Sequence, residues 1–206
     1  MTLEWLLSGL ALIVALVTRP WRVLPAGGPP WVWLSVWAVL PLLWSADRHA
    51  ASAMIQPWSG ASLLVLLAGW PLAVLALAAT ALGLVALNAI GFDQSVTRLA
   101  WLGIAPACLA LGLGAAVRRW LPHHVFVYIF ARAFFGTLLA TVGGGMLELW
   151  RHGAAAGLTA GDQLLARWLA AWGEAIVTGM LVSIFVAFRP RWLATYSDAL
   201  YLPPRR

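Results

Sequence analysis

The uncharged stretch WSGASLLVLLAGWPLAVLALAATALGLVALNAI, at residues 58–90, decides the fold of this chain. A helix that crosses a membrane needs roughly 20 apolar residues, so this stretch is too long for one ordinary span. Its natural break is GWP at residues 69–71, because adjacent Gly and Pro interrupt a helix. The sequence therefore predicts a short apolar piece over residues 58–69, followed by a complete span over residues 71–90.

The composition of the whole chain is that of a protein in lipid. Its 206 residues are 63% hydrophobic and 10% charged, against about 45–50% and about 25% in soluble domains. Lipid tails accept apolar side chains on the outside of a fold, so we expect an all-α polytopic transmembrane bundle in a lipid bilayer. The basic residues are all arginines and, apart from Arg132, stand as singles or pairs at the ends of apolar runs, which excludes a nucleic-acid-binding stripe.

We predict one integral membrane domain over residues 1–206 with about seven membrane segments. The first apolar run could be taken for a signal peptide, but Glu4 stands where a basic region is expected and bases follow the run, so we interpret it as a retained span. The tail at residues 189–206 is expected to be cytoplasmic. The predicted segments cover residues 3–18, 31–44, 58–69, 71–90, 97–117, 121–146 and 168–188.

The distribution of arginine favours seven segments over six, because cytoplasmic loops are rich in Lys and Arg. A hairpin at residues 69–71 would gather eight arginines on one face and four on the other, whereas a single kinked helix would split them seven against five. The sharper asymmetry places the N-terminus outside and the C-terminus in the cytoplasm. The two groups are Arg19, Arg22, Arg118, Arg119, Arg189, Arg191, Arg205 and Arg206 inside, and Arg48, Arg98, Arg151 and Arg167 outside.

The short piece at residues 58–69 is a candidate ligand site. At 1.5 Å per residue it covers only about 18 Å, so it must be tilted, re-entrant or shielded by protein. Transporters place binding sites at short or broken helices, where freed backbone groups line a cavity. We therefore single out Trp58, Ser59 and Gly60; a misplaced segment boundary is the alternative.

Few ionisable residues fall inside the predicted spans. Arg132 lies in the middle of one span, where a charge must face protein and find a partner. Glu174 is the nearest acid by depth, and Glu148 lies near the outer end. We predict an Arg132–Glu174 pair, or a polar network of these residues, which serves either as a structural clamp or as part of a ligand site.

No motif of an enzyme is present. The chain lacks a nucleophile elbow, an H-E-x-x-H motif, a Walker loop and a dinucleotide fingerprint, so we assign no catalytic residue and no cofactor. His123 and His124 diverge on a helix and do not easily share a metal. His49 and His152 are expected in separate outer loops, where solvated side chains are more common than a two-histidine site. Cys108 is expected to be a buried, inert thiol.

Tryptophan and small residues suggest how the segments are anchored and packed. Gly143–Gly145 either permit close helix contact or end a helix, and the small residues of residues 72–89 allow close packing within the chain or against another subunit. Tryptophans at predicted span ends suit the headgroup region; these are Trp21, Trp31, Trp44, Trp58, Trp120, Trp150 and Trp192.

Two stretches carry a family resemblance. LPHHVFVYIFARAFFG at residues 121–136 and GEAIVTGMLVSIFVAFRPRWLATYSDALYL at residues 173–202 resemble the substrate-binding membrane subunits of energy-coupling-factor (ECF) ABC transporters, of the cobalt/nickel (CbiM-like) type and its proteobacterial predicted-permease branch. The resemblance implies a seven-span fold with an outside N-terminus in the bacterial inner membrane. It also implies partners, a transmembrane coupling subunit and cytoplasmic ATPases.

The sequence departs from the family at its metal ligands. Metal-transporting members begin Met-His and carry a second histidine before the short helix; here Thr2 and Pro57 stand in those places. Neither residue supplies the imidazole nitrogen that Ni²⁺ and Co²⁺ favour, so we expect no metal site of that kind. Two functions follow: a substrate-capture subunit for an unknown ligand, or an accessory subunit of a larger membrane complex that kept the fold. An intramembrane enzyme has no supporting constellation.

Overall fold

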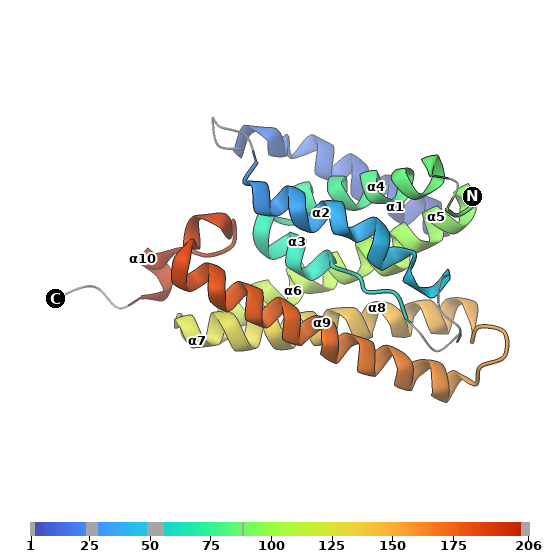
Figure 1. Ribbon diagram of the computed structural model, residues 1–206. Helices are drawn as coiled ribbons and strands as arrows, with labels where there is room; N and C mark the ends of the chain where they lie inside the picture. Colours follow the sequence, from blue (N-terminus) through green and yellow to red (C-terminus); the bar gives the residue numbers. More distant parts are fainter. Residues whose placement is uncertain (1–2, 24–28, 49–55, 88, 203–206) are drawn as a thin grey trace.

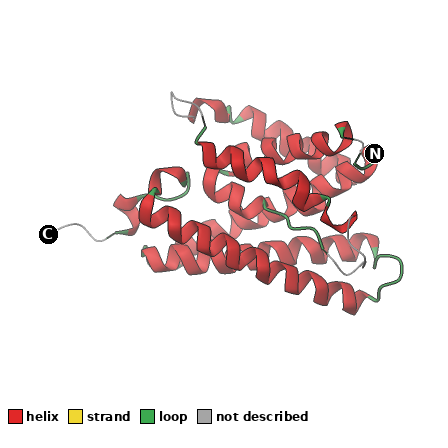
Figure 2. Cartoon of the chain, in the orientation of Figure 1, coloured by secondary structure: helices red, strands yellow, loops and turns green. Residues whose placement is uncertain are grey.

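The computed structural model is a bundle of helices (Figures 1 and 2). It describes residues 3–23, 29–48, 56–87 and 89–202, and every regular element in these ranges is helical, which confirms the all-α class. Two continuous long helices contain π-helical segments, Leu99–Ile104 between α5 and α6, and Tyr128–Phe135 between α7 and α8. The α-helices are α1 (Leu3–Val17), α2 (Trp31–Trp44), α3 (Ala61–Ala68), α4 (Trp70–Ala86), α5 (Phe92–Arg98), α6 (Ala105–Trp120), α7 (Val125–Val127), α8 (Gly136–His152), α9 (Ala160–Phe188) and α10 (Asp198–Tyr201).

Four helices of the described chain are long and apolar enough to cross a membrane: Leu3–Arg22, Phe92–Trp120, Val125–His152 and Ala160–Phe188. Their outer faces carry many exposed apolar side chains, which lipid tails accept and water does not. These features indicate a membrane-embedded protein. The other three predicted segments correspond to shorter helices, α2, α3 and α4.

Helix boundaries agree with the sequence in some places and correct it in others. The bounds of α2 coincide with the predicted segment, and the predicted break falls at Gly69, which has φ +80° between α3 and α4. The predicted start at residue 121 is wrong. The chain is still extended at Leu121, and the helix begins at Val125, where the Nδ1 atom of His124 accepts a hydrogen bond from the Phe126 N–H (3.2 Å).

The last helix begins at Ala160 and not at residue 168, because a capping box starts it. The Thr159 hydroxyl accepts from the Asp162 N–H (3.1 Å), and the Asp162 carboxylate accepts from the Thr159 N–H (3.4 Å). This T-x-x-D pattern is readable in the sequence. The loop before α9 is therefore shorter than the gap between the predicted segments 121–146 and 168–188.

Small residues are used inside the chain. Gly143–Gly145 lie within α8, and a Cβ atom on Gly144 would lie 2.7 Å from Pro106 Cγ of α6. The run therefore permits close contact and does not end the helix. Ala73, Ala78 and Ala81 of α4 are buried in the core cluster that includes α1 residues, so this small-residue face is also occupied within the chain.

Two expectations about single side chains are wrong. Cys108 is exposed on α6, because the outside of the bundle, and not its core, receives this part of the helix. Trp44 is fully buried, and its indole N–H donates to the Ser59 carbonyl (3.0 Å), so it is not a headgroup anchor. Other tryptophans at helix ends are exposed as anchoring requires: Trp21, Trp31, Trp120 and Trp150.

The short helix α3 lies in the centre of the bundle (Figure 1). Its residues from Ala61 to Leu67 are all buried, and α2, α4, α6 and α8 pack around it. Among the three predicted solutions for a short segment, shielding by protein is the one observed. A helix enclosed in this way leaves unpaired N–H groups at its start and unpaired carbonyls at its end, and both need partners.

The segment after α9 folds back onto the bundle. Leu193, Tyr196 and Tyr201 are buried in one cluster with Tyr128. The described part of the predicted cytoplasmic tail, residues 190–202, is thus packed against the bundle. Helix α10 lies at the end of the bundle opposite to the beginning of α1 (Figure 1). Residues 203–206 lie outside the described residues.

Candidate functional site

A carboxylate from α9 caps the beginning of α3. Glu174, which is 3% exposed, accepts hydrogen bonds from the backbone N–H groups of Ser59 and Gly60, both at 2.9 Å. Gly60 has φ +65°, the left-handed conformation that turns the chain into the helix. The negative carboxylate thus lies at the positive end of the α3 dipole and satisfies two buried donors.

The residues before α3 are fixed by further contacts. The Ser59 hydroxyl donates to the Leu102 carbonyl (2.6 Å), within the π-helical segment that follows α5. Trp58 packs against α9 where Gly173 leaves room, since a Cβ atom there would lie 3.0 Å from Trp58 Cζ2. The structure thereby brings the predicted short-helix region, Trp58, Ser59 and Gly60, together with Glu174.

The other end of α3 is capped by the chain after α9. The Ala194 N–H donates to the Leu67 carbonyl (2.9 Å), and the Thr195 hydroxyl donates to the Leu66 carbonyl (3.1 Å). Tyr128 contacts the same Thr195 hydroxyl at 2.8 Å. Arg132 reaches the Thr195 carbonyl (3.5 Å) and lies over the Tyr128 ring, 5.6 Å from its centroid.

The predicted Arg132–Glu174 pair is wrong. The ion pairs between described residues are Arg98–Asp47, Arg167–Glu148 and His152–Glu4. The backbone groups at the two ends of α3, which need partners from outside the helix, explain the difference. Its positive end attracts the acid Glu174, and its negative end has the base Arg132 nearby, so the two charges are drawn to opposite ends of the helix.

A polar cavity of about 450 Å³ lies beside the capped beginning of α3. Its lining includes residues of α5 and of the loop between α8 and α9. These two elements lie at the end of the bundle where α1 begins (Figure 1). Ser59 lines it, so the cavity and the α3 cap share a residue. The polar and charged lining residues are Asp47, Gln56, Ser59, Gln94, Thr97, Arg98, Thr141, Glu148, Gln163 and Arg167.

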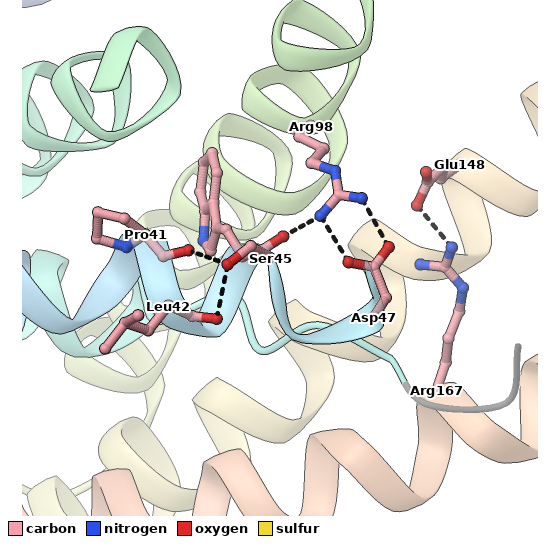
Figure 3. A network of polar contacts seen from close by, with 8 residues as sticks. Pro41, Leu42, Ser45, Asp47, Arg98, Glu148 and Arg167 are labelled. Carbon is pink, nitrogen blue, oxygen red and sulfur yellow. Dashed lines mark hydrogen bonds and ion pairs between the residues drawn. The ribbon is translucent and has the colours of Figure 1, made fainter. Parts of the chain in front are cut away.

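One wall carries a fully engaged ion pair (Figure 3). Arg98 of α5 contacts both oxygens of Asp47, with Nη2–Oδ2 at 2.6 Å and Nη1–Oδ1 at 3.0 Å. The same Nη1 atom donates to the carbonyl of Trp44, the last residue of α2. This bidentate pair joins α5 to the end of α2 and leaves the Arg98 side chain only 12% exposed.

The opposite pair is less engaged. Arg167 Nη2 of α9 lies 2.7 Å from Glu148 Oε2 of α8 (Figure 3). The Arg167 Nε atom is buried without a hydrogen-bond partner among the described residues. Glu148, predicted as part of a network with Arg132 and Glu174, is therefore paired with Arg167 instead.

The sequence did not identify Arg98, Arg167 and Asp47 as site residues. The arginines were counted only as markers of the outer face, and that position was the one available signal. Asp47 follows α2 in a short 3₁₀ turn, Ala46–Arg48, and no periodicity marks it. Their convergence depends on how α2, α5, α8 and α9 pack.

Histidines also differ from expectation. His152 ends α8, and its Nε2 atom lies 2.9 Å from the buried carboxylate of Glu4. Trp101 donates to the same carboxylate (3.3 Å), so His152 is a partner of α1 and not an isolated loop residue. His49, its suggested companion, lies outside the described residues.

The described residues include no cluster of three or more His, Cys, Asp and Glu side chains that could hold a metal ion. Pro57, which stands where the resembling family has a histidine, lines the polar cavity, and Thr2 lies outside the described residues. The chain matches no protein-family model, no curated protein and no solved structure. A proposal about function therefore rests on the fold and on the geometry of the site.

Proposed function

We propose that this chain is a substrate-capture protein of the bacterial inner membrane, which binds a small polar ligand in the cavity beside Ser59. The observation that carries the proposal is the cavity itself, about 450 Å³ of space lined by apolar side chains and by polar ones, four of them charged, at one end of an apolar bundle. Small-molecule sites commonly enclose roughly 300–1,000 Å³. Ionisable groups inside a membrane bundle are costly and typically mark ligand or ion pathways.

The proposed topology has about seven membrane segments, with α2, α3 and α4 as the shorter ones. Arg98 and Arg167 line the cavity, and Arg151 lies in the last turn of α8 at the same end. The arginine-rich ends of α6 and of the segment after α9 carry Arg118, Arg119, Arg189 and Arg191. The positive-inside rule then supports a cavity that opens to the outside, with the C-terminus in the cytoplasm.

The family resemblance supports a place in an ECF-type uptake transporter, with a coupling subunit and ATPases as partners. The cargo would not be the family's metal ion, because Pro57 supplies no imidazole to the cavity. The alternative is an accessory subunit of another membrane complex.

Affinity purification from the native membrane tests the assignment to a transporter. We expect a polytopic coupling subunit and cytoplasmic ATPases in stoichiometric amounts. Stoichiometric association with a complex that contains no ATPase would favour the accessory subunit and overturn the transporter.

Cysteine labelling tests the side to which the cavity opens. In a Cys108→Ala background, Gln94→Cys places a thiol on the cavity wall, and Arg189→Cys places one at the other end of the bundle. A membrane-impermeant maleimide added to intact spheroplasts should label Gln94→Cys and should label Arg189→Cys only after permeabilisation. The reverse pattern would show that the cavity faces the cytoplasm.

A further inference from the structure

We infer that the cavity binds a small zwitterion of the amino-acid class, with its acid group on Arg167 and its ammonium group on Glu148. This inference rests on the proposed function of the cavity as a ligand site. It begins from a difference between the two ion pairs in the cavity wall, each of which joins an arginine to an acidic residue but which are not equally satisfied (Figure 3).

Arg98 has little capacity left for a ligand. Its two terminal nitrogens hold both oxygens of Asp47, and one of them also holds the Trp44 carbonyl. A ligand that displaced Asp47 would also separate α5 from the end of α2. We therefore assign Arg98–Asp47 the structural role of closing one wall.

Arg167 has unused donors. A guanidinium presents five N–H donors. Among the described residues, Arg167 makes one polar contact, from Nη2 to Glu148. The Nε atom is buried and has no hydrogen-bond partner among the described residues, so a ligand would bind the terminal nitrogens Nη1 and Nη2. A carboxylate offers two acceptor oxygens in the planar geometry that a guanidinium favours.

Glu148 provides the matching acceptor. Its Oε2 atom contacts Arg167, Oε1 has no contact among the described residues, and the side chain, which is 27% exposed, lines the cavity. An ammonium group donates up to three hydrogen bonds and would take this free oxygen. The pair thus places a hydrogen-bond donor, Arg167, beside an acceptor, Glu148, and each can make further hydrogen bonds.

Charge balance favours a ligand that carries both signs. Asp47 and Glu148 offset Arg98 and Arg167, so the formal charge of the lining is zero. An anion alone, bound to the unused donors of Arg167, would add an uncompensated negative charge beside Glu148, which is unfavourable in a site of low dielectric. A zwitterion supplies a counter-charge to each partner and leaves the balance unchanged.

The other polar residues of the lining suit a neutral polar side chain on the ligand, while Trp101, Leu102 and Pro106 add apolar surface. Gln94 and Gln163 add amides to the wall, and Gln163 is held in place because its Oε1 atom accepts from the Ala155 N–H (2.7 Å). Thr97 adds a hydroxyl group. These groups donate and accept hydrogen bonds without adding charge.

Thermal-shift and calorimetric titrations of the purified full-length protein in detergent test the inference. The probes are the free amino acids, each compared with the carboxylate that lacks the amine and the amine that lacks the carboxylate, such as alanine, propionate and ethylamine. We expect at least one amino acid to bind, and its two analogues to bind at least about tenfold more weakly.

Two variants locate the site. Arg167→Gln and Glu148→Gln should each weaken binding of that amino acid at least about tenfold, whereas Arg118→Gln at the other end should not change it. Melting temperatures without ligand report whether each variant is folded. If Arg167→Gln does not fold, Arg167→Lys, which keeps the charge and loses the planar donors, provides the same test.

The outcomes separate this inference from the proposed function. Equal binding of the carboxylate or amine alone, binding of neutral sugars, or binding of no amino acid would overturn the zwitterion. The capture function would still stand if Gln94→Cys is labelled from outside and the ATPases are recovered. Failure of both of those experiments would instead remove the proposed function itself.

Discussion

The backbone N–H groups at the beginning of α3 and the backbone carbonyls at its end both need hydrogen-bond partners, and different kinds of group supply them. At its beginning, two N–H groups bind the carboxylate of Glu174, and a polar cavity lies next to this cap. At its end, two carbonyls bind the main chain and the hydroxyl of residues 194–195, under a cluster of buried tyrosines. The end of α3 that Glu174 caps (the charged cap) thus lies next to the cavity. The end that residues 194–195 cap lies under packed side chains, and we call it the filled end. A site that binds ligands is expected at the first end only.

The largest effect should come from Glu174→Ala, which leaves two buried N–H groups at the beginning of α3 without acceptors. Because each hydrogen bond to a charged group contributes roughly 1.5–3 kcal/mol, we expect a loss of about 3 kcal/mol or more in the free energy of unfolding. Thermal or denaturant unfolding in detergent micelles measures it. Glu174→Gln retains one acceptor oxygen and should lose about half as much.

A chemical rescue makes this prediction specific. Acetate fits the space that Glu174→Ala vacates, so it should raise the melting temperature of that variant and leave the wild type unchanged. If Glu174→Ala melted like the wild type, the carboxylate would not be the cap that holds α3.

An intermediate effect should distinguish two glycines of α9. A Cβ atom on Gly173 would lie 3.0 Å from the Trp58 ring, beside the charged cap, whereas on Gly179 the nearest atom, Phe134 Cβ, is at ordinary contact distance, 3.4 Å. Gly173→Ala should therefore destabilise by about 1–2 kcal/mol through overpacking. Gly179→Ala should stabilise by up to about 1 kcal/mol through helix propensity. Unfolding measurements on both variants check the opposite signs; a stabilising Gly173→Ala would show that the α3 cap is loosely packed.

The smallest effect should come from Arg132→Ala at the filled end. The guanidinium makes one long hydrogen bond and a cation–π contact, together worth about 1 kcal/mol. The double variant with Glu174→Ala should be additive within about 0.5 kcal/mol, because the residues share no partner and α3, about 12 Å long, separates their contacts. A double-mutant cycle of unfolding free energies measures this. A coupling above 1 kcal/mol would mean that the two charges interact after all.

Local signals in the sequence mark several of the elements, although the helix starts predicted at residues 121 and 168 were wrong. The GWP sequence marks the break at Gly69, the apolar run from Trp31 to Trp44 gives α2 with its observed bounds, and T-x-x-D marks the beginning of α9. Each of these is a short-range pattern, set by backbone conformation or by hydrogen bonds between near neighbours. The sequence also singled out Glu174 and Ser59 separately, since a buried acid and a short helix are each unusual in lipid.

The partners of these residues could not be predicted in the same way. Depth counting paired Arg132 with Glu174 because it treated the side chains as the only charges, and it left out the helix dipole and the unpaired N–H groups of α3. It also placed Arg167 and Glu148 in the outer region without indicating that α8 and α9 bring them into contact. Such contacts join residues far apart in the chain.

The sequence by itself determined a membrane-embedded, all-α chain with an apolar segment broken at residues 69–71. Apolar composition and a helix break at Gly and Pro are local properties, so no tertiary contact is needed to recognise them. Only the tertiary structure decided that this short segment is shielded by four helices, that Glu174 caps its beginning, and that two unequal ion pairs border a cavity beside it. The physical reason is that a helix enclosed in protein must find hydrogen-bond partners for its ends. Which side chains supply them depends on how distant helices pack.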